Sequence, residues 1–119
     1  MNKLVRLVAL LLLSTLVFAI DRTISWTPPA FNTDGSVLLE QDLDFYTVYC
    51  DGVPLVSIDV IIGTHSAVIS LDALTEGSHA CVLTVTALNG QESAPSNTVN
   101  FTIGPRVPMP PTGLTIALP

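Results

Sequence analysis

The chain has very little positive charge. Its 119 residues include four lysines and arginines against ten aspartates and glutamates, and two of the four, Lys3 and Arg6, lie among the first twenty residues. The rest of the chain therefore carries two arginines against ten acidic side chains, a formal charge of −8. A surface this acidic repels phosphate backbones and anionic lipid headgroups. We therefore expect no nucleic-acid partner, and solubility is the simplest role of the charge.

Combinations of residues that carry catalysis or bind metals are also scarce. The chain has two histidines, His65 and His79, and the serines nearest to them, Ser66 and Ser78, adjoin them directly. Side chains one residue apart on a strand point to opposite faces, so neither pair predicts a nucleophile with its base. No close Cys or His spacing offers the four ligands of a zinc site. We expect no enzyme activity, no metal and no cofactor.

The only long apolar run is at the N-terminus. Basic residues precede an apolar run over residues 7–18, and the small side chains of Val17 and Ala19 occupy the positions that determine cleavage. This pattern is typical of a secretory signal peptide, here residues 1–19. The run is short for a hydrocarbon core about 30 Å thick, and an uncleaved signal anchor is the alternative. We expect a secreted chain, extracellular or periplasmic, that does not insert into a membrane once the leader is removed.

Beyond residue 20 the chain shows no convincing amphipathic helix. Short stretches alternate apolar with polar residues and are separated by Pro, Gly, Asn and Asp, which is typical of an all-β fold. We expect strands near residues 23–27, 46–50, 55–60, 81–88 and 98–103. Asp51-Gly52 predicts a tight hairpin turn, and Asn89-Gly90 predicts another turn.

A polar loop is expected over residues 31–44. It contains Asn32 and Asp34, and further acidic residues follow up to Asp44. Their oxygen atoms are ligands of the kind that Ca²⁺ prefers, but their spacing fits no EF-hand. A solvated loop in which Asn and Asp favour turns is the simpler interpretation.

A series of motifs follows in a fixed order along the chain. They are Ile24-Ser-Trp-Thr-Pro-Pro29, Tyr46-x-Val48, Leu74, Val85-x-Ala87-x-Asn89 and Ala94-Pro-Ser96. Over about residues 22–103 their order and spacing resemble fibronectin type III domains, most of all short exported bacterial or bacteriophage proteins with one such domain. The resemblance implies an immunoglobulin-like sandwich of two sheets over residues 20–104, with Trp26 in the core on strand B. A proline-rich tail, residues 105–119, follows it.

The cysteines mark one departure from the family pattern. The tyrosine that usually begins strand F is replaced, and Cys81 falls at or next to its place. In this fold Cys50 ends strand C and Cys81 begins its antiparallel neighbour, strand F. The resemblance and the oxidising compartment expected after export together imply a disulfide between them. Two small buried thiols are the alternative.

The second departure concerns strand A, because almost nothing precedes strand B after the predicted cleavage site. Yet the segment Pro108-Met-Pro-Pro-Thr-Gly-Leu-Thr-Ile116 resembles the start of a fibronectin type III strand A. The tail would either fold back on its own domain or pair, through residues 108–119, with a neighbouring copy to give a homo-oligomer. A disordered tail is the third interpretation.

We expect a non-catalytic module that binds a protein or a glycan at a cell or virion surface. Loops on a rigid sandwich commonly carry recognition, so the candidate binding residues are Asn32, Asp34, Tyr49 and Asp51. Tyr49 is included because alternation turns it away from the core. The alternative function is that of a self-associating structural subunit that uses C-terminal strand addition.

Overall fold

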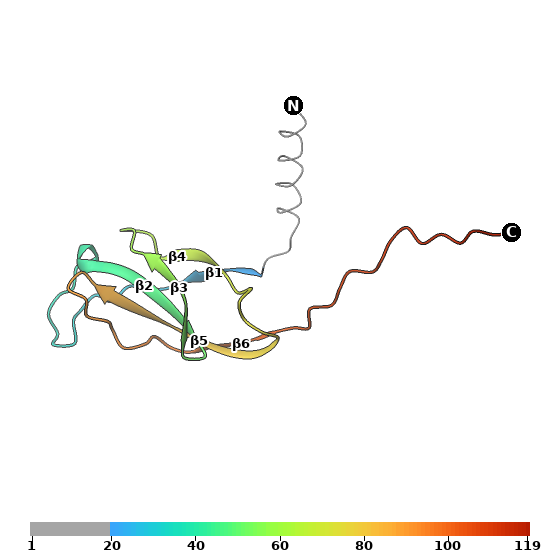
Figure 1. Ribbon diagram of the computed structural model, residues 1–119. Coiled ribbons are helices and arrows are strands. Elements are labelled where there is room, and N and C mark those ends of the chain that lie inside the picture. The colour runs from blue at the N-terminus through green and yellow to red at the C-terminus, as the bar shows by residue number, and fades with distance from the viewer. Residues whose placement is uncertain (1–19) are drawn as a thin grey trace, which may run out of the picture.

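The computed structural model describes residues 20–119, so the predicted leader and its cleavage site lie outside the described residues (Figure 1). The described chain is all-β, as the alternating patterns predicted. Its strands are β1 (Asp21–Ser25), β2 (Leu43–Cys50), β3 (Val53–Asp59), β4 (Ser66–Ser70), β5 (Gly77–Ala87) and β6 (Val99–Ile103), with one 3-10 turn, η1, at Glu40–Asp42. Over residues 20–119 no helix has the length and apolar character needed to cross a bilayer.

The strands form two antiparallel sheets. β1 pairs with β4, and the larger sheet has the order β3-β2-β5-β6. In Figure 1 the β1–β4 pair lies above β5 and β6. Buried side chains from both sheets meet between them, because one cluster joins Val48 of β2 and Ile103 of β6 with Ile69 of β4. This arrangement confirms the predicted two-sheet sandwich.

The inward face of β2 carries the best-buried side chains. Tyr46, Val48 and Cys50 are 2%, 4% and 3% exposed, as their alternation predicted. Trp26 packs beside them, with its ring centroid 4.7 Å from that of Tyr46. However, β1 ends at Ser25, earlier than the sequence pattern suggested, and Trp26 is only partly buried.

The Asp51-Gly52 turn joins β2 to β3, and on its other side β2 pairs with β5. Asp51 and Gly52 have φ angles of 54° and 79°, which a two-residue type I′ hairpin requires and which Asp-Gly favours. The register of β2 on β5 then pairs Cys50 with Cys81, and the two form a disulfide. The predicted disulfide is therefore confirmed.

One side of β1 has no partner among residues 20–119, where β1 pairs with β4 alone. The Ile20 carbonyl accepts a hydrogen bond from the Leu71 N–H (2.7 Å), and the Trp26 N–H donates to the His65 carbonyl (3.0 Å). Backbone hydrogen bonding alternates along an antiparallel pair. The even-numbered residues of β1 therefore bond β4, and the backbone groups of Asp21, Thr23 and Ser25 face the open side.

The C-terminal tail forms no strand and runs away from the sandwich (Figure 1). Its last hydrogen bonds to the domain are made by Arg106, whose N–H donates to Glu76 Oε1 and whose guanidinium donates to the Leu74 carbonyl, both at 2.7 Å. The structure thus does not show the tail folded back on its own domain.

Candidate functional site

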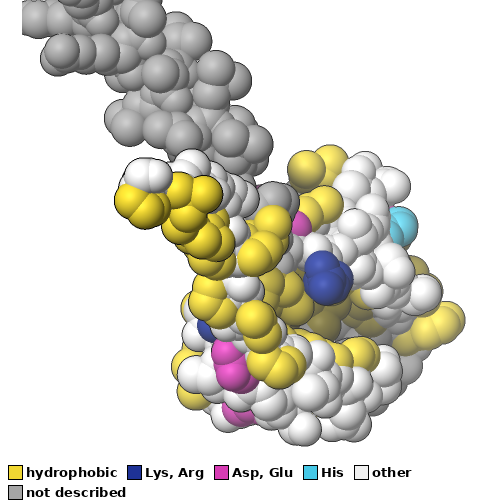
Figure 2. All heavy atoms as spheres, turned by 90° about the vertical axis from the view of Figure 1, so that its right-hand side faces the viewer, with side chains coloured by type: hydrophobic (Ala, Val, Ile, Leu, Met, Phe, Trp, Pro, Cys, Tyr) yellow, Lys and Arg dark blue, Asp and Glu magenta, His cyan; other side chains and the backbone are white. Residues whose placement is uncertain are grey.

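A groove of about 1120 Å³ opens between the free side of β1 and β6. Residues from β1, β2, β5 and β6 contribute to its lining. They include Ile24, Tyr46, Leu83, Val85, Phe101 and Ile103. Figure 2, which views the molecule from the right-hand side of Figure 1, shows hydrophobic side chains gathered in a hollow beside a basic one. The groove is thus lined by apolar side chains of the sandwich interior, of which Tyr46, Val85 and Ile103 are buried and Ile24, Leu83 and Phe101 are partly exposed.

The charge of the groove differs from that of the rest of the domain. Arg22 and Arg106 both line it, and they are the two basic residues of the described chain apart from histidine. Not one of the ten acidic residues, all of which the structure describes, lines it. The lining of the groove therefore carries positive charge only, so a basic segment would be repelled from it, whereas an uncharged or acidic segment would not.

Two polar atoms beside the groove are buried without a partner. Within residues 20–119, neither Trp26 Nε1 nor the Tyr46 hydroxyl makes a hydrogen bond, although both residues line the groove. Burial raises the pKa of Tyr46, so its hydroxyl stays protonated and able to donate. A buried polar group without a partner costs about 1–3 kcal/mol. Both groups can donate a hydrogen bond, but neither atom is itself exposed at the surface of the groove.

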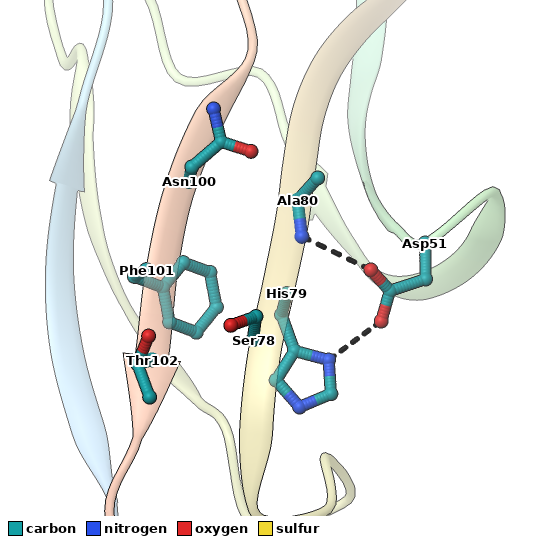
Figure 3. Close-up of a pocket in the computed structure, with 7 residues that line it drawn as sticks. All are labelled: Asp51, Ser78, His79, Ala80, Asn100, Phe101 and Thr102. Carbon is teal, nitrogen blue, oxygen red and sulfur yellow. Dashed lines mark hydrogen bonds and ion pairs between the residues drawn. The ribbon is translucent and has the colours of Figure 1, made fainter.

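A second, smaller hollow of about 310 Å³ lies at the start of β5 (Figure 3). Its lining residues are Asp51, Ser78, His79, Ala80, Asn100, Phe101 and Thr102. In the protonated ring, His79 Nδ1 donates to Asp51 Oδ2 (2.5 Å) and His79 Nε2 donates to the Thr75 carbonyl (2.6 Å). Asp51 Oδ1 also accepts from the Ala80 N–H (3.0 Å). Because both ring nitrogens of His79 are engaged, neither is free to take a proton from Ser78.

The His79–Asp51 pair should make stability depend on pH. The hydrogen bond to Asp51, followed by that to Thr75, raises the pKa of His79 above its usual 6.5. The bonds from His79 and Ala80 lower the pKa of Asp51 below 3.8. The contribution of His79 to the stability of the fold is therefore complete below about pH 6.5 and is lost as the pH rises through its raised pKa. The contribution of Asp51 to stability is lost only in acid, as the pH falls through its lowered pKa.

We accordingly expect the urea concentration at the midpoint of unfolding to decrease as the pH is raised from 6 to 9. His79→Gln keeps a polar side chain but removes the titration, so the difference between wild type and variant should shrink across this range. Urea unfolding at several pH values measures this difference. A difference that stays constant with pH would contradict the assignment.

The four predicted binding residues do not form one site. Asn32 and Asp34 lie in the loop before β2, whereas Asp51 follows its other end. Asn32 Nδ2 donates to Ser36 Oγ (3.1 Å), and Ser36 donates to Asp34 through both its N–H and its hydroxyl. These bonds order the loop turn.

Tyr49 faces away from the core, as its alternation predicted. Its hydroxyl donates to Glu92 Oε2 (2.7 Å), which also accepts from Thr84 Oγ1 (2.7 Å). The polar atoms of Tyr49 and Asp51 are thus already paired inside the domain. A role of these residues in binding stays a prediction.

The sequence matches no protein-family model and none of the curated proteins. The likeness to fibronectin type III domains thus stays an interpretation of the motifs.

Sequence reasoning missed the groove as a site. It found almost nothing before strand B, and it treated residues 98–103, which include Val99, Phe101 and Ile103, only as a strand. These residues run from exposed to buried along β6, at 55% exposure for Val99 and 8% for Ile103. The available signal was the apolar alternation of these three residues in the last expected strand.

Proposed function

We propose that the chain is an exported, non-catalytic β-sandwich module of the fibronectin type III kind that binds an extended polypeptide segment in the groove beside β1. The observation that carries this proposal is the free backbone edge at Thr23 standing directly beside an apolar groove. An edge strand offers unpaired N–H and C=O groups to another strand, and adjacent apolar pockets select its alternate side chains. The disulfide fits an oxidising compartment, as export would provide.

The size of the groove favours a peptide over a small molecule. Ligand pockets usually hold about 300–1,000 Å³, and this groove slightly exceeds that range. It is also bordered by two strand edges, β1 in one sheet and β6 in the other. A strand placed there would complete the smaller sheet and cover the apolar side chains.

Strand addition is better supported than recognition through the loops. The carboxylates and amides of Asn32, Asp34 and Asp51 make hydrogen bonds within the domain. A loop ligand would have to compete with these bonds. The groove, in contrast, is bordered by a strand edge that lacks a partner among the described residues.

A peptide titration tests the proposal. We expect a short synthetic peptide of alternating threonine and valine to bind the mature chain and to change the fluorescence of Trp26, the only tryptophan, which lines the groove. A scrambled peptide that lacks the alternation should bind at least about tenfold more weakly, because half of its apolar side chains would face solvent.

The matched variants are Thr23→Pro and Thr23→Ala. Proline removes a backbone N–H that faces the open side, so it leaves the β1–β4 hydrogen bonds in place, whereas alanine keeps the N–H. Loss of one hydrogen bond, added to the bulk of the ring, should weaken peptide binding by about tenfold or more in Thr23→Pro. Equal affinity of both variants, or no fluorescence change with wild type, would refute strand addition.

A further inference from the structure

The tail carries the residue pattern of a strand with one apolar face. Leu114, Ile116 and Leu118 alternate with Thr115 and Ala117. The three large side chains are 87%, 77% and 83% exposed. In an extended segment they project to one side and the small residues to the other. A row of exposed large apolar side chains on one face points to burial against a partner.

This segment fits the groove in length and in charge. Seven residues, 112–118, span about 23 Å as a strand at about 3.3 Å per residue, enough to run along β1, which has five residues, and past Trp26. No charged side chain follows Arg106 in the sequence, and no acidic residue lines the groove. The tail therefore brings no cation that Arg22 and Arg106 in the groove would repel.

The same segment is poorly placed to fill the groove of its own domain. After Arg106 is held by Glu76 and Leu74, the chain continues through Pro108, Pro110 and Pro111. Proline-rich segments are stiff and advance about 3.1 Å per residue, so residues 104–111 carry the strand-like part about 25 Å from β6. Figure 1 shows the tail leading away from the sandwich.

Strand direction also disfavours binding of the tail in the groove of its own domain. β6 ends opposite Gly77, where β5 begins, and β1 begins opposite Ser70, where β4 ends. Only a short connection separates β4 from β5, so β6 ends near the point where β1 begins. A tail that turned back would run parallel to β1, whereas the tail of another molecule can enter antiparallel, which is the slightly more stable pairing.

We propose that the segment bound in the groove is the C-terminal tail of a second copy, with Leu114, Ile116 and Leu118 facing the interior of the acceptor sandwich. This inference rests on the proposed function and names its partner. The tail and the groove are different surfaces of one chain, so the contact is head to tail. Contacts of this kind leave a free groove at one end and a free tail at the other, and they propagate into open chains of subunits.

Light scattering coupled to size-exclusion chromatography of the mature chain tests this proposal. We expect its mass to grow with concentration. Ile116→Asp should weaken assembly by about 10- to 100-fold, the value of burying one large aliphatic side chain, while Thr115→Asp adds the same charge on the other face and should assemble like wild type. Both residues lie in the exposed tail, so neither change affects folding of the domain.

Mixing two defective variants distinguishes assembly between copies from closure within one. Ile116→Asp keeps its groove and Thr23→Pro keeps its tail, so each alone should be monomeric and their mixture should form particles of two chains and no larger. A mixture that stays monomeric, equal loss of assembly in Thr115→Asp and Ile116→Asp, or a wild type that is monomeric at every concentration would overturn the inference. If the threonine–valine peptide still binds in that case, the proposed function stands and only the identity of the bound segment is wrong. If the peptide does not bind either, the proposed function is wrong as well.

Discussion

Tyr46→Ala should lower the free energy of unfolding by about 3–5 kcal/mol, the cost of truncating a buried aromatic side chain. Tyr46 is 2% exposed and belongs to the cluster with Leu43 and Val85. Its ring also packs against Trp26 at 4.7 Å between centroids. Close-packed neighbours relax only partly into the space that a truncated side chain leaves, so a cavity should remain.

Tyr46→Phe is the matched control for this prediction. It keeps the ring but removes a buried hydroxyl that has no hydrogen-bond partner in the described part of the chain. Removing an unpaired buried polar group is close to neutral or stabilising. Urea unfolding with linear extrapolation compares the three proteins. If Tyr46→Phe were as destabilised as Tyr46→Ala, or Tyr46→Ala were as stable as wild type, the packing account of this site would be wrong.

Loss of the disulfide is the second large effect that we expect. Cys50 and Cys81 are separated by 31 positions, and the chain-entropy model gives about 3–4 kcal/mol for closing such a loop. The double variant Cys50→Ala, Cys81→Ala should therefore unfold at a clearly lower urea concentration than the oxidised wild type. Cys50 is 3% exposed, so a smaller loss from packing adds to the effect.

Reductant supplies the control for the disulfide prediction. Reducing the wild type should lower its urea midpoint toward that of the double variant, while the variant itself should not respond. Thiol labelling of the unfolded, unreduced protein should find no free cysteine. Full labelling of both cysteines, or a wild type and variant with the same midpoint in oxidising conditions, would contradict the assigned bond.

Much of the fold could be predicted because strand patterns are local. Tyr46, Val48 and Cys50 alternate with outward residues at the period of a strand, and the structure buries all three. Asp51-Gly52 likewise predicts its own turn, because few residue pairs accept positive φ at both positions. The end of β1 was harder to place, because Ser25 and Trp26 continue the same alternation.

The sites were less predictable because they depend on contacts between distant residues. The His79–Asp51 pair joins positions 28 apart, and the Tyr49–Glu92 bond joins positions 43 apart. No local sequence pattern predicts either contact. The predicted cleavage site leaves almost nothing before the first strand, which suggested an edge without a partner. The groove, however, arises from how the two sheets pack, and that arrangement is a property of the whole domain.

The most direct test of the central claim is the peptide titration followed at single amides. The Thr23 and Ser25 N–H groups face the open side of β1, while those of Arg22 and Ile24 face β4. In the Ile116→Asp variant without peptide, hydrogen exchange should be fast at Thr23 and Ser25 and slow at Arg22 and Ile24. Adding the threonine–valine peptide should slow exchange at Thr23 and Ser25 without changing the other two amides. Exchange at Thr23 and Ser25 that remains fast at saturating peptide would contradict the claim that this edge receives a strand.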